Sequence, residues 1–169
     1  MIQALTVPGN EELLYRAITR TVGGRADGKS RSADGNLEVR FAFPGPRRSG
    51  TNPEQLLAAA WSACFESTMG FVASRREIAM PEHVLIDTEI DLNLGREGFF
   101  LGARLDVELP GMTRETASAL VEEAYRECPF SKAMRGNVDI SINLILAGVR
   151  RAAMDHLSGP SEKTFLFAS

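Results

Sequence analysis

The chain has 169 residues, of which 44% are hydrophobic and 24% are charged. This length supports one globular domain with a sizeable core and is too short to predict two. With 19 Lys plus Arg against 22 Asp plus Glu, the net charge of -3 gives no field that attracts a polyanion, so nucleic acid is not expected as a partner.

The sequence has none of the usual signs of export or of a membrane span. The N-terminus shows no basic-then-apolar signal pattern, and no stretch approaches the ~18 uninterrupted apolar residues of a span. We therefore expect a cytoplasmic protein that does not bind a membrane. Only two cysteines occur, Cys64 and Cys128, without CxxC spacing, and His83 and His156 are isolated from them in sequence. We predict no metal site and no bound cofactor.

The first part of the chain predicts a small sheet. Its expected parts are a strand at 12–22, a loop at 23–29, a strand, turn and strand at 29–43, and a Pro/Gly loop at 43–50. The turn is placed at Asp34-Gly35-Asn36, because these residues tolerate positive φ between two extended runs.

A long apolar helix follows. Two start signals compete: Asn52 as the cap with Pro53 at the first helical position, or a capping box of Thr51 and Glu54. Residues 56–72 are apolar around most of the helix circumference, so we expect the helix to run through the core.

The second half of the chain predicts a hairpin, a second helix and a last strand. Residues 83–110 alternate on both sides of a Gly95 to Gly98 turn. From Thr113 an apolar stripe of helical period runs to Cys128, and Pro129 ends that helix. Residues 131–137 predict one or two further helical turns, and residues 138–146 predict a strand.

This order of elements lacks regular βαβ alternation and predicts an α+β fold. We assign residues 1–147 to one domain and residues 148–169 to a C-terminal extension that is not a separate domain.

The two thiols have two interpretations. Free cysteine usually behaves as a small buried hydrophobe, so packing alone is a sufficient reason for Cys64 and Cys128. Two core helices of one domain commonly pack together, however. If the sulfurs come within disulfide range, the pair becomes a redox couple in a compartment where structural disulfides are uncommon.

A buried thiol needs a nearby cation to act as a nucleophile, because burial raises its pKa above the free value of about 8.5. The start of its own helix is too distant, since Cys64 lies roughly 15 Å along the axis from Glu54. Arg25, which follows Gly23-Gly24, is the candidate cation, and a solvated loop charge is the alternative. Glu54 either supports the cap and the helix dipole or holds an arginine by a bidentate pair.

Several short motifs occur together in a specific order. They are Gly23-Gly24-Arg25, Ser32-Ala33-Asp34-Gly35, Thr51-Asn52-Pro53-Glu54-Gln55-Leu56, Ala63-Cys64-Phe65, Pro110-Gly111, Cys128-Pro129-Phe130-Ser131 and Arg135-Gly136-Asn137. In order and spacing they resemble the organic hydroperoxide resistance proteins, the Ohr branch of the OsmC/Ohr family. The similarity runs from about residue 12 to residue 147.

The resemblance implies a cysteine-based, lipoyl-dependent peroxidase that reduces alkyl and fatty-acid hydroperoxides to alcohols. By this resemblance Cys64 attacks the peroxide and Cys128 resolves the sulfenic acid as an intramolecular disulfide, while Arg25 and Glu54 activate the thiolate and orient the peroxide. It also implies two central helices against curved antiparallel sheets, an intertwined homodimer with its sites at the subunit interface, and dihydrolipoyl groups of lipoylated proteins as the reductant.

Two hypotheses extend this interpretation. Because a straight helix keeps Glu54 away from Cys64 of the same chain, each site is expected to combine Cys64 and Cys128 of one subunit with Arg25 and Glu54 of the other. Apolar residues near the thiol are expected to line a pocket for an alkyl or acyl tail, with ordinary core packing as the alternative. These residues are Leu57, Trp61, Phe65, Phe130 and Met134.

Two other function classes stay open. A thiol redox sensor would use the same disulfide to control a partner, and a non-catalytic OsmC-like ligand-binding dimer would leave the thiols inert.

Overall fold

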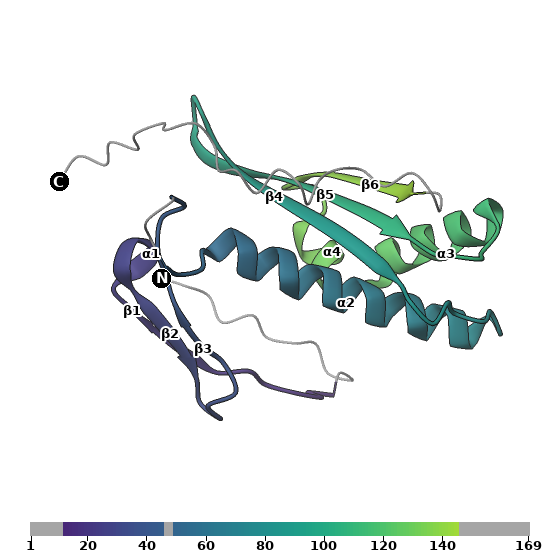
Figure 1. Cartoon of the computed structure of the whole chain (residues 1–169), viewed down its shortest axis with the longest axis horizontal. Coiled ribbons are helices and arrows are strands. Elements are labelled where there is room, and N and C mark those ends of the chain that lie inside the picture. The colour runs from purple at the N-terminus through teal and green to yellow at the C-terminus, as the bar shows by residue number, and fades with distance from the viewer. Residues whose placement is uncertain (1–11, 46–48, 146–169) are drawn as a thin grey trace. The chain divides into compact units, whose positions relative to one another are not determined.

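The structure is a computed structural model that describes residues 12–45 and 49–145. The chain forms two compact units (Figure 1), the first made of Met1–Phe43 with Arg47–Thr51 and the second of Pro44–Pro46 with Asn52–Ser169. Each unit has a three-stranded sheet of its own. The assignment of residues 1–147 to one domain stays a prediction.

The N-terminal unit contains an antiparallel sheet in the order β1-β2-β3. Its strands are β1 (Thr19–Val22), β2 (Lys29–Ser32) and β3 (Glu38–Arg40). The predicted turn is confirmed, and Gly35 has a φ of 79° there. The first strand is shorter than predicted. Thr19 pairs with Ser32, the last residue of β2, so among the described residues β2 does not extend far enough to pair with residues 12–18.

The expected loop between β1 and β2 contains a one-turn helix, α1 (Gly24–Asp27), which carries Arg25. Gly23 and Gly24 enter it with φ values of 79° and 64°, a region that favours glycine. Gly28 then lets the chain pass close to itself, because a Cβ at this position would lie 2.1 Å from the Gly24 carbonyl oxygen. Glycine therefore makes the tight return into β2 possible.

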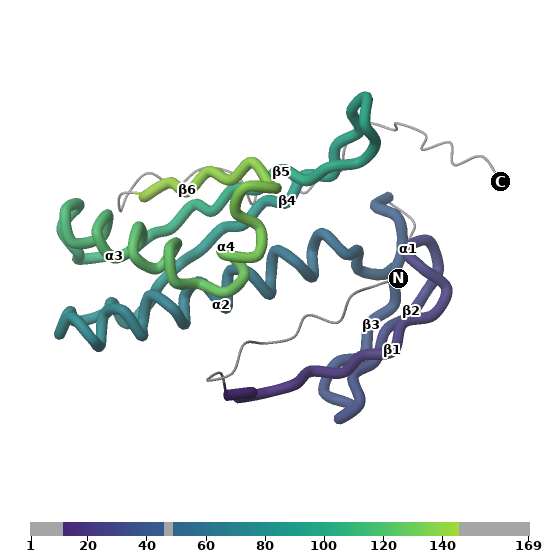
Figure 2. Tube along the Cα trace, turned by 180° about the vertical axis from the view of Figure 1, so that it is seen from behind, coloured from purple at the N-terminus to yellow at the C-terminus, as the bar shows by residue number. Residues whose placement is uncertain are grey.

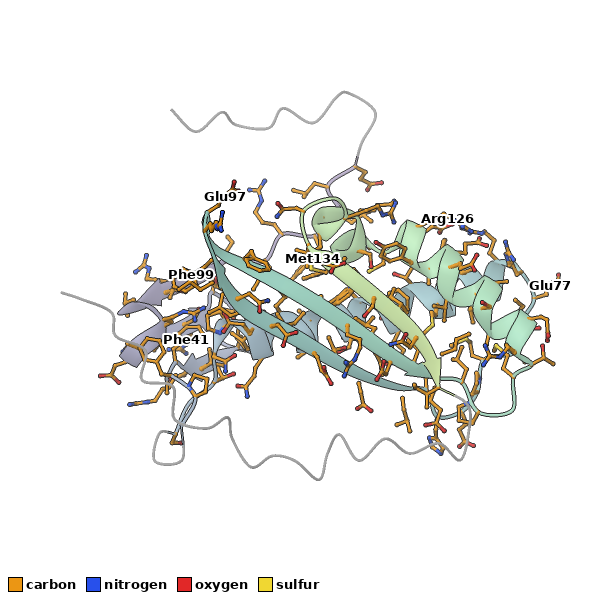
Figure 3. The ribbon with its side chains drawn as sticks, turned by 90° about the horizontal axis from the view of Figure 1, so that it is seen from above. Phe41, Glu77, Glu97, Phe99, Arg126 and Met134 are labelled. Carbon is orange, nitrogen blue, oxygen red and sulfur yellow. The ribbon has the colours of Figure 1, made fainter. Side chains whose placement is uncertain are left out.

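The C-terminal unit contains three helices and the second sheet (Figures 1 and 2). Its elements are α2 (Pro53–Arg75), β4 (Leu85–Gly95), β5 (Gly98–Glu108), α3 (Arg114–Glu127), α4 (Pro129–Met134) and β6 (Asp139–Ile145). The predicted hairpin is confirmed, and Glu97 marks its tip (Figure 3). The last short helix begins at Pro129, earlier than predicted.

This second sheet is mixed. β4 pairs antiparallel with β5 from Leu85↔Glu108 to Gly95↔Gly98, whereas β6 pairs parallel with β5. The expectation of antiparallel sheets is therefore wrong for the β5–β6 pair. The physical reason is the connection between these strands. α3 and α4 return the chain to the end of the sheet from which β5 runs, so β6 can run in the same direction, which a tight hairpin does not allow.

The N-terminus of α2 follows the first of the two predicted start signals. The Asn52 side-chain oxygen accepts a 2.8 Å hydrogen bond from the Gln55 amide, and Pro53 occupies the first helical turn. Asn52 thus satisfies one of the amides that the helix itself leaves without a partner.

Within its own unit, helix α2 packs against β4, α3 and α4. Trp61, Phe65, Met69, Val72 and Ala73 are its buried residues. Ala59, Ala60, Ala63 and Phe71 are exposed on the other side, and Phe71 is 63% exposed. The expectation that the helix runs through the core therefore holds for one face within the described chain. By length and composition α2 could also span a membrane, a test that core helices of soluble proteins pass as well.

Candidate active site

The structure brings the two cysteines together. Cys128 Sγ lies 3.6 Å from Cys64 Sγ and donates a hydrogen bond to it, and both thiols are free. Cys128 is fully buried and Cys64 is half-buried. A disulfide has a sulfur separation of about 2.05 Å, so a movement of about 1.5 Å would join them.

The backbone at the end of α3 turns Cys128 toward α2. Cys128 has φ -56° and ψ 124°, an extended conformation that a following proline favours, and its amide still donates to the Ala124 carbonyl at 2.8 Å. Pro129 then opens α4 as its first helical residue. Cys128 therefore lies at the junction of two helices whose directions differ.

Burial raises the pKa of the Cys64 thiol above its ordinary value. A hydrogen bond that the Phe130 backbone donates to the Cys64 sulfur lowers this pKa. The neighbouring Cys128 raises it further, and Thr68 lowers it. None of these groups carries a positive charge. Burial therefore disfavours the Cys64 thiolate, and a nearby cation would favour it.

The other two predicted catalytic residues belong to different units. Glu54 is half-buried in the first turn of α2, in the same unit as the cysteines. Arg25 belongs to α1 of the N-terminal unit. Their roles at the thiol stay predictions.

The predicted apolar pocket residues differ in burial. Trp61 and Phe65 are fully buried in the core cluster, Met134 is 9% exposed, Leu57 is half-buried and Phe130 is 37% exposed. None of the five lines either of two grooves in the described part of the chain. One of these, of about 490 Å³, lies between α3 and β6, and the other, of about 990 Å³, follows β1 and β2.

Three sets of side-chain contacts that the sequence did not predict join α2, α3 and α4. Trp61 Nε1 donates to Ser131 Oγ at 3.0 Å in the core. Arg135 Nη2 donates to the Tyr125 carbonyl at 2.6 Å. The buried Glu123 pairs with Arg75 and Arg76 at the end of α2. A signal for the second contact is present in the sequence, since Pro129 removes the amide that a helix would offer to the Tyr125 carbonyl.

Residues 45–143 match the profile of a protein family described as OsmC-like protein. The chain is 36% identical over 138 residues to the organic hydroperoxide resistance protein of Xanthomonas axonopodis pv. citri, a match that covers 79% of this chain and 96% of that protein.

Solved structures with the same fold carry similar descriptions. One is an organic hydroperoxide resistance protein of Legionella pneumophila, with a TM-score of 0.74 and 39% identity over 79% of this chain and 98% of that chain. Another is the organic hydroperoxide resistance protein OhrB of Bacillus subtilis, with a TM-score of 0.73 and 36% identity over 79% of this chain and 100% of that chain.

Proposed function

The chain belongs to the OsmC-like family, and we propose that it is a cysteine-based peroxidase that reduces alkyl and fatty-acid hydroperoxides to alcohols in the cytoplasm. The observation that carries this proposal is the 3.6 Å separation of the Cys64 and Cys128 sulfurs. Relatives named for organic hydroperoxide resistance support the class of substrate.

The reaction divides into three steps. The Cys64 thiolate attacks an oxygen of the peroxide, the O–O bond breaks, and the alkoxide leaves with a proton as the alcohol. Cys64 is then a sulfenic acid, the reversible first stage of thiol oxidation. The Cys128 sulfur attacks the Cys64 sulfur, the S–S bond forms, and the S–O bond breaks to release water. A dithiol finally reduces the disulfide by exchange.

The different burial of the two thiols supports separate tasks for them. Cys64 has the exposure that a peroxide needs to reach it, whereas the fully buried Cys128 meets only the oxidised partner beside it. A resolving thiol at 3.6 Å competes with further peroxide for the sulfenic acid and so limits oxidation to the irreversible sulfinic acid.

Arg25 and Glu54 complete the proposed site. A guanidinium near Cys64 would favour the thiolate against the effect of burial and would stabilise the departing alkoxide. Glu54 would hold that guanidinium by a planar, two-point ion pair.

A homodimer would bring these residues to the cysteines from the partner subunit. Exposed apolar residues support such an interface: Leu13, Leu14, Tyr15, Ile18 and Val22 in the N-terminal unit and Phe71 on α2. A three-stranded sheet without a covered apolar face is not stable alone in water.

Mixed dimers of a Cys64→Ser chain and an Arg25→Ala chain test the composite site. We expect about half of the wild-type activity per dimer, because one site keeps both residues. Complete inactivity of the mixed dimer would rule out sites that are shared between subunits.

The proposed reductant is the dihydrolipoyl group of a lipoylated protein. The decisive assay follows peroxide consumption with cumene hydroperoxide and compares dihydrolipoamide with thioredoxin, in the wild type and in Cys64→Ser. Sustained turnover with dihydrolipoamide, lost in Cys64→Ser, supports the enzyme. Oxidation that stops after one equivalent would indicate a redox sensor, and unreactive thiols would indicate a ligand-binding dimer.

A further inference from the structure

The carbonyl of Tyr125 has a special position in the last turn of α3. In a continuous helix it would accept a hydrogen bond from the amide of the residue four positions later, which here is Pro129. Proline has no amide hydrogen, so the helix cannot supply this bond. The same proline gives Cys128 its extended conformation. Pro129 thus has two effects. It favours the extended backbone of Cys128, and it leaves the Tyr125 carbonyl without a donor from the helix.

Arg135 supplies the missing donor from the far side of α4. Its Nη2 donates to the Tyr125 carbonyl at 2.6 Å, and its guanidinium carbon lies 4.7 Å from the centre of the Tyr125 ring. The cation–π contact and the hydrogen bond both involve Tyr125. Together they fix the orientation of the Arg135 guanidinium and its distance from Tyr125. The Arg135 amide also donates to the Ser131 carbonyl at 2.9 Å, which fixes the arginine to the end of α4.

The hydrogen bond from Arg135 to the Tyr125 carbonyl joins two residues that flank Cys128 in sequence. Tyr125 and Arg135 are ten residues apart in sequence, and Cys128 lies between them. Within the same segment, Ser131 is tied to α2 by its hydrogen bond from Trp61. The Arg135–Tyr125 contact therefore sets the angle between α3 and α4 at the point where Cys128 faces Cys64.

We propose that Arg135 is a positioning residue for Cys128, which holds the resolving sulfur within reach of Cys64 during disulfide formation. The proposal rests on the proposed peroxidase function. Arg135 acts through the backbone of Tyr125, and its effect falls on one step: attack of Cys128 sulfur on the Cys64 sulfenic acid, in which the S–S bond forms, the S–O bond breaks and water leaves.

Arg135→Ala is the direct test, and Arg126→Ala is the matched control. Arg126, labelled in Figure 3, is an exposed arginine on α3 and lies two residues before Cys128 in sequence. Its removal changes the net charge equally without touching the Tyr125 carbonyl contact. Each variant receives one equivalent of cumene hydroperoxide, and quenched samples are analysed by mass spectrometry for sulfenic acid trapped with a dimedone reagent, disulfide and sulfinic acid.

We expect Arg135→Ala to form its disulfide roughly fivefold to tenfold more slowly than the wild type, with more trapped sulfenic acid and more sulfinic acid. The rate of the first step with peroxide should change less, by about twofold at most, because Cys64 itself lies on α2 and a shift of α4 would affect it mainly through the Phe130 backbone hydrogen bond. Arg135→Lys keeps the charge but not the planar stack, so its rate should lie between those of Arg135→Ala and the wild type.

A disulfide rate in Arg135→Ala equal to that of Arg126→Ala would overturn the proposal, and so would equal slowing of both steps, which would indicate general damage. If the wild type does not react with peroxide, the proposed peroxidase function is wrong, but the role of Arg135 can still be tested. The positioning role would then be judged in glutathione redox buffers. There the Cys64–Cys128 disulfide of Arg135→Ala should be several-fold easier to reduce than that of Arg126→Ala, and an unchanged midpoint would contradict the role.

Discussion

Trp61 and Ser131 share a hydrogen bond of 3.0 Å in the core, although 70 residues separate them in sequence. Both side chains are fully buried. Trp61 lies on α2 less than one turn from Cys64, and Ser131 lies on α4 close to Cys128, so this bond joins the two segments that carry the thiols.

Removal of either partner should destabilise the protein. Ser131→Ala leaves a buried indole N–H unpaired and should cost about 1–3 kcal/mol of unfolding free energy. Trp61→Phe leaves a cavity as well as an unpaired hydroxyl and should cost about 2–4 kcal/mol. Urea unfolding at one fixed protein concentration measures both values, because a dimer makes stability depend on concentration.

The double variant tells whether the bond itself carries the effect. We expect the losses in the two single variants to sum to about 1 kcal/mol more than the loss in the double variant. Strict additivity would show that the two side chains act independently.

Glu123 is 8% exposed and pairs with Arg75 and Arg76 across the α2–α3 contact. Glu123→Ala should cost about 1–2 kcal/mol, less than a fully buried pair would, because both arginine side chains are 46% exposed and can return to water. The neighbouring Glu122→Ala is the control, since Glu122 is exposed and its loss should change stability by less than about 0.5 kcal/mol. Equal unfolding midpoints for the two variants would contradict this role of Glu123.

The thiol of Cys64 should show a pH dependence that reports on Arg25. Burial raises the pKa of this thiol, so in Arg25→Ala we expect the rate of alkylation of Cys64 by iodoacetamide to rise with a midpoint above the ordinary thiol value of about 8.5. The wild-type midpoint should lie lower, because the proposed cation favours the thiolate. Superimposable profiles for the two proteins would exclude Arg25 from the site.

The same titration affects the stability of Arg25→Ala. A folded-state pKa above the unfolded one means that the contribution of the thiol is fully present below the unfolded pKa and is lost as the pH rises through the folded pKa. Urea midpoints of Arg25→Ala should therefore fall above about pH 8.5. The double variant Arg25→Ala with Cys64→Ser should lack the part of this decrease in urea midpoint that comes from the thiol. A decrease identical to that of Arg25→Ala alone would contradict the assignment to Cys64.

Gly28→Ala should disrupt the segment that carries Arg25. Its Cβ would meet two backbone oxygens, that of Gly24 at 2.1 Å and that of Val22 at 2.5 Å, which no side-chain adjustment can relieve. Peroxidase activity should fall by at least about tenfold through displacement of Arg25, while the Cys64–Cys128 disulfide keeps its stability in glutathione buffers.

Gly35→Ala is the control in the same sheet. It adds only the strain of a positive φ, about 1 kcal/mol, because its Cβ would lie 3.5 Å from the end of the Arg31 side chain. Wild-type activity in Gly28→Ala would show that the conformation of α1 is not needed for the reaction.

Local sequence patterns predicted most elements correctly. The alternation in 83–110 and the helical stripe that ends at Cys128 correspond to β4, β5 and α3, because the burial of one face imposes a period on the chain. The pairing of β6 could not be predicted, since a strand pattern indicates which face is buried but not which neighbour lies beside it or in which direction. The uniformly apolar α2 likewise gave no sign of which face is buried, because a helix that is apolar all round has no preferred direction.

The two cysteines could be singled out from the sequence, but the contacts that bring them together could not. Motifs identified Cys64 and Cys128 as a pair, whereas their separation depends on packing between elements distant in sequence. The Arg135–Tyr125 contact depends on the absence of one amide at Pro129, which becomes evident only when each backbone group near a helix end is matched with a partner.

The parallel pairing of β6 with β5 has a consequence for biosynthesis. β6 can join the sheet only after the entire crossover through α3 and α4 has left the ribosome, since parallel neighbours depend on long-range chain closure. Cys128 lies inside that crossover. The pairing of β6 with β5 therefore fixes both ends of the crossover that carries Cys128.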